Sequence, residues 1–378
     1  MTTREFMACG RLLPAWCMLL FGVPAVAQHQ PTITSIDAPG AGTTSGYGTL
    51  IQAINPAGVI AGYYVGFDNV AHAYVRTPDG WFTSFDGPGV PLSAPTGPLS
   101  PPSPWANTSA PGTYAAAINA LGAVTGYHID ANYVAHGYVR TPDGRFTSFD
   151  VPHAGKAAGQ GTLSTNINLE GTIAGSYVDA DNASHAFLRT RDGAIAEFDV
   201  PGSSGTWLGW AQCISTTGAI NGTYADAAGV DHGFVRYPNG EMTTFEVAAS
   251  GLGAGQGTNT WSINAAGATA GAFVDAGNAY HGLVRNAAGK ITIFDVQGAV
   301  NTTVENIGPT GVAVGDYKDA NSAHHGFMRS PQGELSFFDI PGAGGGPGQG
   351  TVPLFNTADT VVGFWVDDNY VWHGFVRQ

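Results

Sequence analysis

Cysteine and charged residues are both scarce in this sequence of 378 residues. Only one of its three cysteines, Cys213, lies beyond the first 27 residues, so we expect no internal disulfide in the rest of the chain and a buried, unreactive Cys213 thiol. Charged residues make up 11% of the chain, whereas a disordered protein carries much charge and few apolar residues. The two shortages together indicate a folded protein with a large buried core.

Positive charge is especially low. There are 14 Lys and Arg residues against 28 Asp and Glu residues, which gives a formal net charge of −14. Such a chain is repelled by phosphate backbones and by anionic lipid, so we expect neither nucleic acid nor a membrane surface as a partner. A neutral ligand or a cation is favoured, and an anionic polymer is disfavoured unless a local patch overrides the overall charge.

Long hydrophobic runs are missing beyond the start of the chain. The apolar run "LLPAWCMLLFGVPAVA" follows Arg4 and Arg11 and ends at Ala27. It is short and interrupted by proline, which is typical of a secretory leader and not of a membrane span. We therefore expect residues 1–27 to be a Sec-type signal peptide, and the chain to be secreted or periplasmic with no transmembrane segment.

Glycine, by contrast, is abundant, with 55 positions, and the chain is built from repeats. A histidine followed four residues later by an arginine recurs along the whole sequence. The histidines are His72, His136, His185, His232, His281, His325 and His373. They are 44 to 49 residues apart, except for one gap of 64 residues that holds the Pro-rich insertion 87–112. We expect this insertion to be an extended surface loop, with a lid over a channel as the alternative.

Each repeat contains four short β-rich runs separated by glycine-containing turns. In the first repeat these runs are "TLIQAIN", "VIAGYYV", "HAYVRTP" and "WFTSFDGP". Repeats of this length with four strands are typical of propeller blades. A fourth-strand motif, "ITSIDAPGAG", also precedes the first repeat, while the chain stops at "HGFVRQ" without one. We predict an all-β fold, a seven-bladed β-propeller of four-stranded blades spanning 28–378 as one domain, closed by the N-terminal strand, which completes the last blade.

The repeat pattern G-x-Y-x-D…HGF…R…G…FD-x-PG, preceded by "INxxG", resembles the HAF-type extracellular repeats of bacterial exported proteins. The likeness covers essentially all of residues 32–378, with departures at Gly66, Ser215, Glu246 and Gly308. It implies export and a β-propeller-like fold. It implies no established catalytic residues.

The repeated histidine and arginine are predicted to be structural. A catalytic centre is normally singular, whereas a set such as His325, Arg329 and Asp339 recurs in every repeat. We expect the imidazole and guanidinium groups to contact backbone carbonyls or the fourth-strand carboxylate. Histidines of different blades are too far apart to share one ion, so no metal site is predicted.

The loops between second and third strands are acidic, as in "DADNASH" at 179–185. They lack the central glycine and distal glutamate of a calcium loop. Asp and Asn suit tight turns, so we expect turn-stabilising hydrogen bonds, with weak calcium binding as the lesser alternative and no other cofactor.

The positions that vary between repeats are the candidates for function. Exposed rings beside Asp, Asn and Gly are typical of a sugar-binding platform. The predicted ligand-binding residues are His128, Tyr133, Trp207, Tyr280, Tyr370 and Trp372. Trp210 and Trp261 are expected mainly to fill gaps between blades.

Three functions remain open from the sequence. The favoured one is a monomeric exported propeller that binds a polysaccharide or another exported macromolecule. The alternative is a polysaccharide lyase or glycoside hydrolase, for which the repeat-specific residues His128, Tyr133, His153 and Lys156 would have to converge. The third is a structural envelope protein. No catalytic residue is assigned.

Overall fold

The computed structural model describes residues 31–93 and 110–378, which form strands and connecting loops. The predicted signal peptide 1–27 and residues 94–109 of the predicted insertion lie outside the described residues. No helix among the described residues has the length and apolar character to cross a membrane. The described residues from Thr32 onward form one compact unit.

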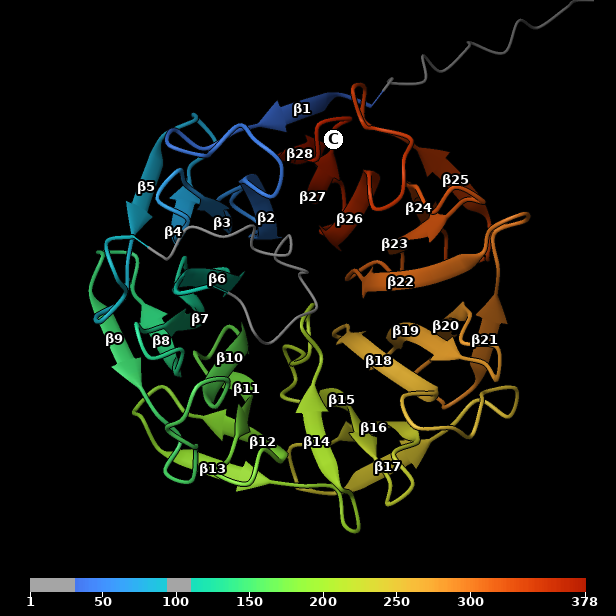
Figure 1. Ribbon diagram of the computed structural model, residues 1–378. Helices are drawn as coiled ribbons and strands as arrows, with labels where there is room; N and C mark the ends of the chain where they lie inside the picture. Colours follow the sequence, from blue (N-terminus) through green and yellow to red (C-terminus); the bar gives the residue numbers. More distant parts are fainter. Residues whose placement is uncertain (1–30, 94–109) are drawn as a thin grey trace, which may run out of the picture. The chain divides into compact units, whose positions relative to one another are not determined.

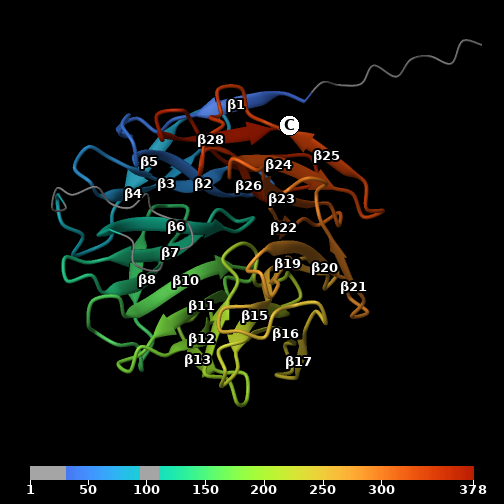
Figure 2. The same cartoon turned by 45° about the vertical axis from the view of Figure 1, so that its right-hand side comes forward.

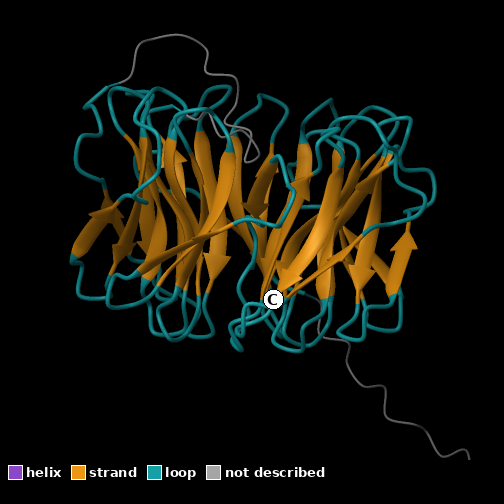
Figure 3. Cartoon of the chain, turned by 90° about the horizontal axis from the view of Figure 1, so that it is seen from below, coloured by secondary structure: helices purple, strands orange, loops and turns teal. Residues whose placement is uncertain are grey.

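Consecutive strands pair antiparallel into four-stranded units, arranged around a common centre (Figure 1). The first is β2 (Gly48–Ile54), β3 (Ile60–Val65), β4 (Ala71–Arg76) and β5 (Phe82–Phe85). The second and third are β6 (Gly112–Ile118), β7 (Val124–Ile129), β8 (Ala135–Arg140), β9 (Phe146–Phe149), and β10 (Gly161–Ile167), β11 (Ile173–Val178), β12 (Ser184–Arg189), β13 (Ile195–Phe198). The connecting loops lie on two opposite faces (Figure 3).

The later units keep the same order, and neighbouring units lie side by side (Figure 2). They are β14 (Gly205–Leu208), β15 (Ile220–Ala225), β16 (Asp231–Arg236), β17 (Met242–Phe245); β18 (Gly257–Ile263), β19 (Thr269–Val274), β20 (Tyr280–Arg285), β21 (Ile291–Phe294); and β22 (Asn301–Ile307), β23 (Ala313–Lys318), β24 (His324–Arg329), β25 (Leu335–Phe338).

The two ends of the described chain meet in the last unit. It consists of β26 (Gly350–Asn356), β27 (Val361–Val366), β28 (Trp372–Arg377) and, as its outer strand, β1 (Ile33–Ile36). β1 pairs antiparallel with β28, with Ile33 opposite Arg377 and Ile36 opposite Gly374. The N-terminal strand thus takes the place that the fourth strand has in the other units. The strand pairings as a whole form one 20-stranded and one eight-stranded sheet.

Most innermost strands begin with a glycine that touches the preceding unit. Gly161, with φ of 119°, pairs in parallel with Ala135, and a Cβ atom there would lie 2.1 Å from the Ala135 carbonyl oxygen. Only a residue without a side chain fits such a close approach. The same bridge occurs at the first residue of β2, β6, β18 and β26. β22 begins with Asn301 instead.

The innermost strands β2, β6, β10, β18, β22 and β26 each contain a β-bulge. In β22 the pairing with β23 skips one residue between Val304 and Asn306, so Glu305 has no opposite partner on β23. The corresponding residues are Gln52, Ala116, Thr165, Trp261 and Leu354. A bulge redirects a side chain out of the regular alternation of the strand.

The repeated histidine links the third and fourth strands. Nδ1 of His325 lies 2.9 Å from Asp339 Oδ2, and the equivalent contact recurs in every unit. In the last unit the carboxylate is that of Asp37, which follows β1, and it contacts His373. Nε2 faces a carboxylate of the acidic loop, as in the 3.3 Å contact of His185 with Asp179. Of the two partners predicted for the histidine, backbone carbonyls and the fourth-strand carboxylate, the structure shows the carboxylate.

The repeated arginine links neighbouring units. The guanidinium carbon of Arg329 lies 4.9 Å from the centre of the Phe294 ring, which belongs to the preceding unit. Five other arginines make the same cation–π contact between units, whereas Arg76 faces Phe82 of its own unit. Such contacts add about 0.5–2 kcal/mol each, depending on exposure. The ring faces of phenylalanine, and not the predicted oxygens, are thus the main partners.

The core lies between adjacent units. Phe327 of β24 has no exposed surface and packs with Val304 of its own unit and with Val296 and Phe294 at the end of the preceding one. Cys213 is fully buried in a similar cluster, and burial raises the pKa of its thiol to about 12, as expected for an unreactive cysteine.

Asparagines of the "INxxG" motif connect the turns of successive units. The Asn119 Oδ1 atom accepts hydrogen bonds from the backbone N–H groups of Leu121 and Ala123, which closes its own turn. Its Nδ2 donates to the carbonyl of Asn168 in the next unit at 3.0 Å. Asn55 repeats this arrangement toward Asn119.

We expect Asn119→Ala to lower the free energy of unfolding by about 2 kcal/mol, because it leaves buried backbone groups without partners. Chemical denaturation measures the change. Asn132→Ala, in an exposed turn, is the matched control and is expected to change stability by no more than about 0.5 kcal/mol. Equal effects of the two substitutions would contradict the proposed role of Asn119.

Stability should also depend on pH through the repeated histidines. The hydrogen bond to Asp86 raises the pKa of His72 above its ordinary value of 6.5. For His185 and His373 burial opposes protonation, but the facing carboxylates outweigh it and raise the pKa. A raised pKa favours the folded state below about pH 6.5, and this stabilisation is lost as the pH rises through the folded-state value.

The melting temperature is therefore expected to fall between about pH 5.5 and about pH 8. Differential scanning calorimetry at low salt measures this. In the triple variant His72→Gln, His185→Gln, His373→Gln the fall should be smaller, and an unchanged pH dependence would refute the assignment.

Candidate functional site

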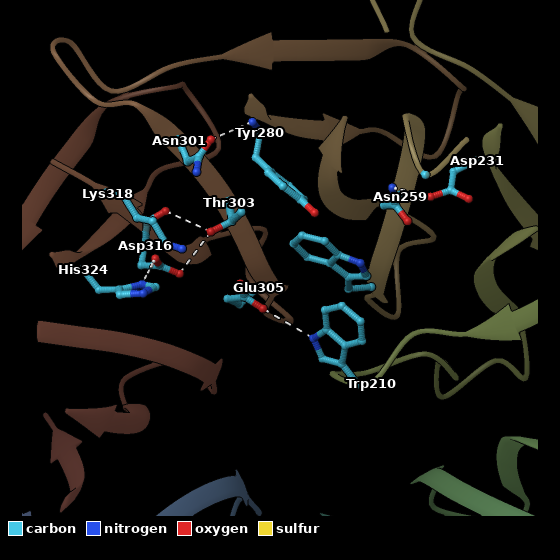
Figure 4. A pocket seen from close by; sticks show the side chains of 12 residues that line it. Trp210, Asp231, Asn259, Tyr280, Asn301, Thr303, Glu305, Asp316, Lys318 and His324 are labelled. Carbon is cyan, nitrogen blue, oxygen red and sulfur yellow. Dashed lines mark hydrogen bonds and ion pairs between the residues drawn. The ribbon is translucent and has the colours of Figure 1, made fainter. Parts of the chain in front are cut away.

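A cavity of about 290 Å³ opens where the innermost strands of three successive units meet. The β14–β17 unit contributes Trp210 and Asp231 to its wall, and the β18–β21 unit contributes Asn259, Trp261 and Tyr280. The β22–β25 unit contributes Asn301, Thr303, Glu305, Asp316, Lys318 and His324 (Figure 4). Its size is near the lower end of small-ligand pockets, roughly 300–1,000 Å³.

The cavity lies at the joint where the innermost glycine is replaced. In most units the first N–H of the third strand donates to the carbonyl before that glycine, as His324 does to Gln349 at 2.8 Å. At this joint the Tyr280 N–H donates instead to Asn301 Oδ1 at 2.9 Å. An amide side chain therefore substitutes for the direct backbone bridge, and β20 and β22 share no ladder pairing among the described residues.

One part of the wall is aromatic. The rings of Trp210 and Trp261 are stacked, with centroids 4.9 Å apart and an interplanar angle of 24°. Trp261 occupies the bulge position of β18. Tyr280 is the first residue of β20, and its ring points toward the middle of the cavity with 38% of its surface exposed (Figure 4).

Glu305 faces these rings from the bulge position of β22. It is only 1% exposed, and the Trp210 indole N–H donates to Oε2 at 3.4 Å. Burial, together with the nearby charge of Asp316, raises the pKa of the Glu305 carboxyl well above its ordinary value. Glu305 therefore tends to hold its proton.

The buried Asp316 pairs with the partly exposed His324 beside Glu305. Asp316 is 3% exposed, and its Oδ1 accepts the Thr303 hydroxyl at 3.0 Å. Its Oδ2 lies 2.6 Å from His324 Nδ1. Because a carboxylate accepts, Nδ1 carries the hydrogen, which leaves the lone pair of a neutral imidazole on Nε2.

Two further charged groups complete the cavity. Asn259 Nδ2 donates to Asp231 Oδ2 at 3.2 Å, and burial raises the pKa of Asp231. Lys318 is the last residue of β23, and its ammonium group has no ion-pair partner within 4.0 Å among the described residues. The wall thus combines flat rings with amide, hydroxyl, carboxyl and ammonium groups.

The predicted candidates are spread over several places. Tyr280 lines the cavity, and so do Trp210 and Trp261, which the sequence predicted mainly to fill gaps. Tyr133 and Tyr370 are 42% and 41% exposed in the turns between second and third strands. Both have positive φ values, 63° and 60°, at the turn position where other units have Asn, Ser or Gly.

The other candidates are wholly or partly covered. Trp372 is 6% exposed and stacks on Phe364, with ring centroids 5.1 Å apart. Trp207 in β14 is half-buried. These two rings therefore differ from the exposed platform that the sequence predicted.

His128 is corrected from a surface candidate to an interior residue. It is 2% exposed, its ring stacks on His136, and its Nε2 contacts Ser148 at 2.8 Å. Burial, with the neighbouring His136, lowers its pKa to about 4. The reason is its place in β7, where other units have an aromatic residue that stacks on the repeat histidine.

The four residues whose convergence would have favoured an enzyme are not gathered in one cavity wall. His153 is on the surface and pairs with Glu197 at 2.7 Å. His128 is inside the second unit, while Tyr133 lies in an exposed turn and Lys156 in the exposed loop before β10. The acidic loops form turns, as expected: Asp179 Oδ1 accepts the backbone N–H groups of Asp181 and Ala183.

Glu305, Asp316, Lys318 and His324 are not among the residues predicted from the sequence, although a comparison of the repeats contains a signal for the last three. When the repeats are aligned on the glycine of the second strand, Lys318 stands at a position that is apolar in every other repeat, as in Val65, Ile129 and Val366. Asp316 stands where the other repeats have an aromatic or small residue, and His324 stands where they have Ala, Ser, Asp, Tyr or Trp. A cation at an apolar position, beside an aspartate and a histidine that no other repeat has at these two positions, marks a specialised surface.

We expect Glu305→Gln to stabilise the protein above about pH 4.5, by an amount that grows as the pH rises. The pKa of Glu305 is raised in the folded state, so ionisation of its carboxyl disfavours folding. The wild-type chain therefore loses stability as the pH rises above 4.5, the ordinary pKa of a glutamate. Glutamine stays neutral at every pH and does not cause this loss. Urea denaturation at several pH values measures the difference. Glu170→Gln, at an exposed turn, is the control, and a pH-independent difference for Glu305→Gln would contradict the burial argument.

Comparisons with known proteins concern the fold. No protein-family model matches the chain, and no curated protein matches it either. The BP39L lectin from Burkholderia pseudomallei is similar with a TM-score of 0.51 at 10% identity, over 86% of this chain and 94% of the lectin. TolB from Acinetobacter baumannii has a TM-score of 0.43 at 10% identity, over 92% and 80%. The six-bladed β-propeller lectin of Aleuria aurantia has a TM-score of 0.40 at 10% identity, over 82% and 94%. The chain is an all-β, propeller-like repeat protein.

Proposed function

We propose that this chain is an exported, seven-bladed β-propeller that binds a carbohydrate in the cavity beside β22. The observation that carries the proposal is the composition of the cavity wall. Stacked Trp210 and Trp261, with the exposed Tyr280 ring, offer flat apolar faces, and amide and hydroxyl groups of Asn259, Asn301 and Thr303 surround them. Sugar rings present apolar C–H faces and hydroxyl edges that suit this combination.

The fold proposal rests on the strand pairings. Six units have four strands of their own, and β1 supplies the fourth strand to the last unit. A closed ring of seven blades removes the open sheet edges that an incomplete first or last blade would leave. The repeats are proposed to be of the HAF type, and residues 1–27 to be a Sec-type signal peptide that is cleaved off during export.

Charge and comparison point in the same direction. A net charge of −14 disfavours nucleic acid. The BP39L protein, which has a similar fold, is a lectin. Binding of a sugar therefore agrees with the architecture and with the chemistry of the cavity.

We expect Tyr280→Ala to weaken glycan binding about tenfold, equivalent to about 1.4 kcal/mol, because a stacking surface at the cavity is lost. The purified chain is first screened on an array of neutral and uronate-containing oligosaccharides, and the best ligand is then titrated by calorimetry. Tyr237→Ala is the matched control, since Tyr237 is similarly exposed, at 36%, in the turn after β16. Failure of the wild-type chain to retain any glycan, or equal losses in both variants, would refute the proposal.

A further inference from the structure

His324 differs from the seven repeated histidines in the use of its ring nitrogens. In His72, for example, both nitrogens lie 3.0 Å from a carboxylate, from Asp86 and from Asp68. His324 has only Nδ1 bound, to Asp316, and no partner for Nε2 occurs among the described residues. Its Nε2 is therefore available to a ligand in the cavity.

Asp316 fixes this histidine in one orientation and one tautomer. The carboxylate is itself held by the Thr303 hydroxyl, and it is nearly inaccessible to water. A buried carboxylate on Nδ1 makes Nε2 a better proton acceptor and stabilises the imidazolium that forms. No repeat histidine has a partner buried to this extent, since the fourth-strand carboxylates are all about half exposed.

The groups around the pair are those that an elimination reaction requires. Lys318, on the same strand as Asp316, presents an ammonium group without an ion-pair partner in the described part of the chain. Glu305, whose burial raises its pKa, supplies a neutral carboxylic acid within the same wall. Figure 4 shows Glu305, Asp316 and His324 around one open space.

We propose that the cavity cleaves uronate-containing glycans by β-elimination, with His324 as the base, Lys318 as the carboxylate-binding group and Glu305 as the acid. The proposal rests on glycan binding at the same cavity and extends it from retention to chemistry. Asp316 is a positioning residue, because it acts through His324.

The step balances without a co-reactant. His324 Nε2 removes the proton from the carbon next to the uronate carboxylate, whose negative charge the Lys318 ammonium neutralises. The electron pair forms a carbon–carbon double bond, and the bond from the adjacent carbon to the glycosidic oxygen breaks. That oxygen takes the proton from the Glu305 carboxyl, and proton transfer through solvent restores both residues.

The acidic net charge of the chain does not decide the charge of this cavity. The Asp316 carboxylate accepts hydrogen bonds from His324 and Thr303, and Glu305 is neutral while it holds its proton. Asp231 is hydrogen-bonded to Asn259 on the other side of the wall. Lys318 therefore remains as a local positive charge for a uronate, while the rest of the acidic surface is screened over about 10 Å at ordinary salt.

The test uses the whole chain with polygalacturonate, alginate and hyaluronan as probes. The ultraviolet absorbance of the unsaturated uronate measures product, and affinity electrophoresis in gels that contain the same polymers measures retention. We expect product from at least one polymer, and a loss of about 100-fold or more in His324→Gln with retention unchanged. Asp316→Asn should lower kcat far more than it changes KM, because it alters the tautomer and not the binding surface.

The matched control is the next residue in the chain. His325→Gln removes a repeat histidine and should lower the melting temperature while the elimination rate stays the same. Lys318→Gln breaks no ion pair among the described residues, so the fold should be unaffected. It should weaken retention of uronate polymers but not of neutral glycans.

Each outcome bears on a different statement. Retention without unsaturated product on all three polymers, or undiminished product in His324→Gln, overturns the elimination proposal and leaves the binding proposal standing. No retention and no product on the three polymers also overturns the elimination proposal, and the binding proposal itself falls only if the array of neutral and uronate-containing glycans shows no retention either. Should His324→Gln fail to melt cooperatively, Lys318→Gln decides, because unchanged turnover in that variant also overturns the elimination proposal.

Discussion

The direct backbone contact between neighbouring units determines how the rest of this protein is arranged. At five joints a glycine brings the innermost strand so close to the preceding unit that a Cβ atom would lie within about 3 Å of the backbone there. These contacts set the spacing of the innermost strands. The cavity lies at a joint where Asn301 takes the place of glycine and its side chain makes the link. The presence of glycine at a joint therefore explains the close packing of two units, and its replacement by Asn301 explains the opening at the cavity.

Charge acts within the units and aromatic rings act between them. The histidine–carboxylate contacts hold the outer strands, and the arginine–phenylalanine contacts join neighbouring units. The repeated histidines and arginines have the same structural role in each repeat. Both ring nitrogens of His72, for example, contact carboxylates, so neither is free to bind or react with a ligand. The unit of β22–β25 has the same frame and adds Asp316, Lys318 and His324 on its inner surface. Function is therefore proposed where a unit departs from the repeat.

The bulge of the innermost strands explains why such departures reach the cavity. A residue at the bulge is released from the ladder, so its side chain is redirected without loss of strand pairing on either side. Trp261 and Glu305 both use this position. A tryptophan and a buried carboxyl in adjacent units then form parts of one wall, although they are far apart in sequence.

The sequence by itself determined the repeats, the four strands of each, the pairing of β1 with β28 and the contact between the repeated histidine and the fourth-strand acid. These follow from local spacing, because turn residues and alternation act over a few positions. It did not reveal the burial of His128 and Trp372, or the convergence of Trp210, Tyr280, Glu305 and His324. Only the tertiary structure decided these, because burial and the pKa of a carboxyl depend on which side chains surround the group in space, from its own unit and from neighbouring units, and linear spacing does not contain that information.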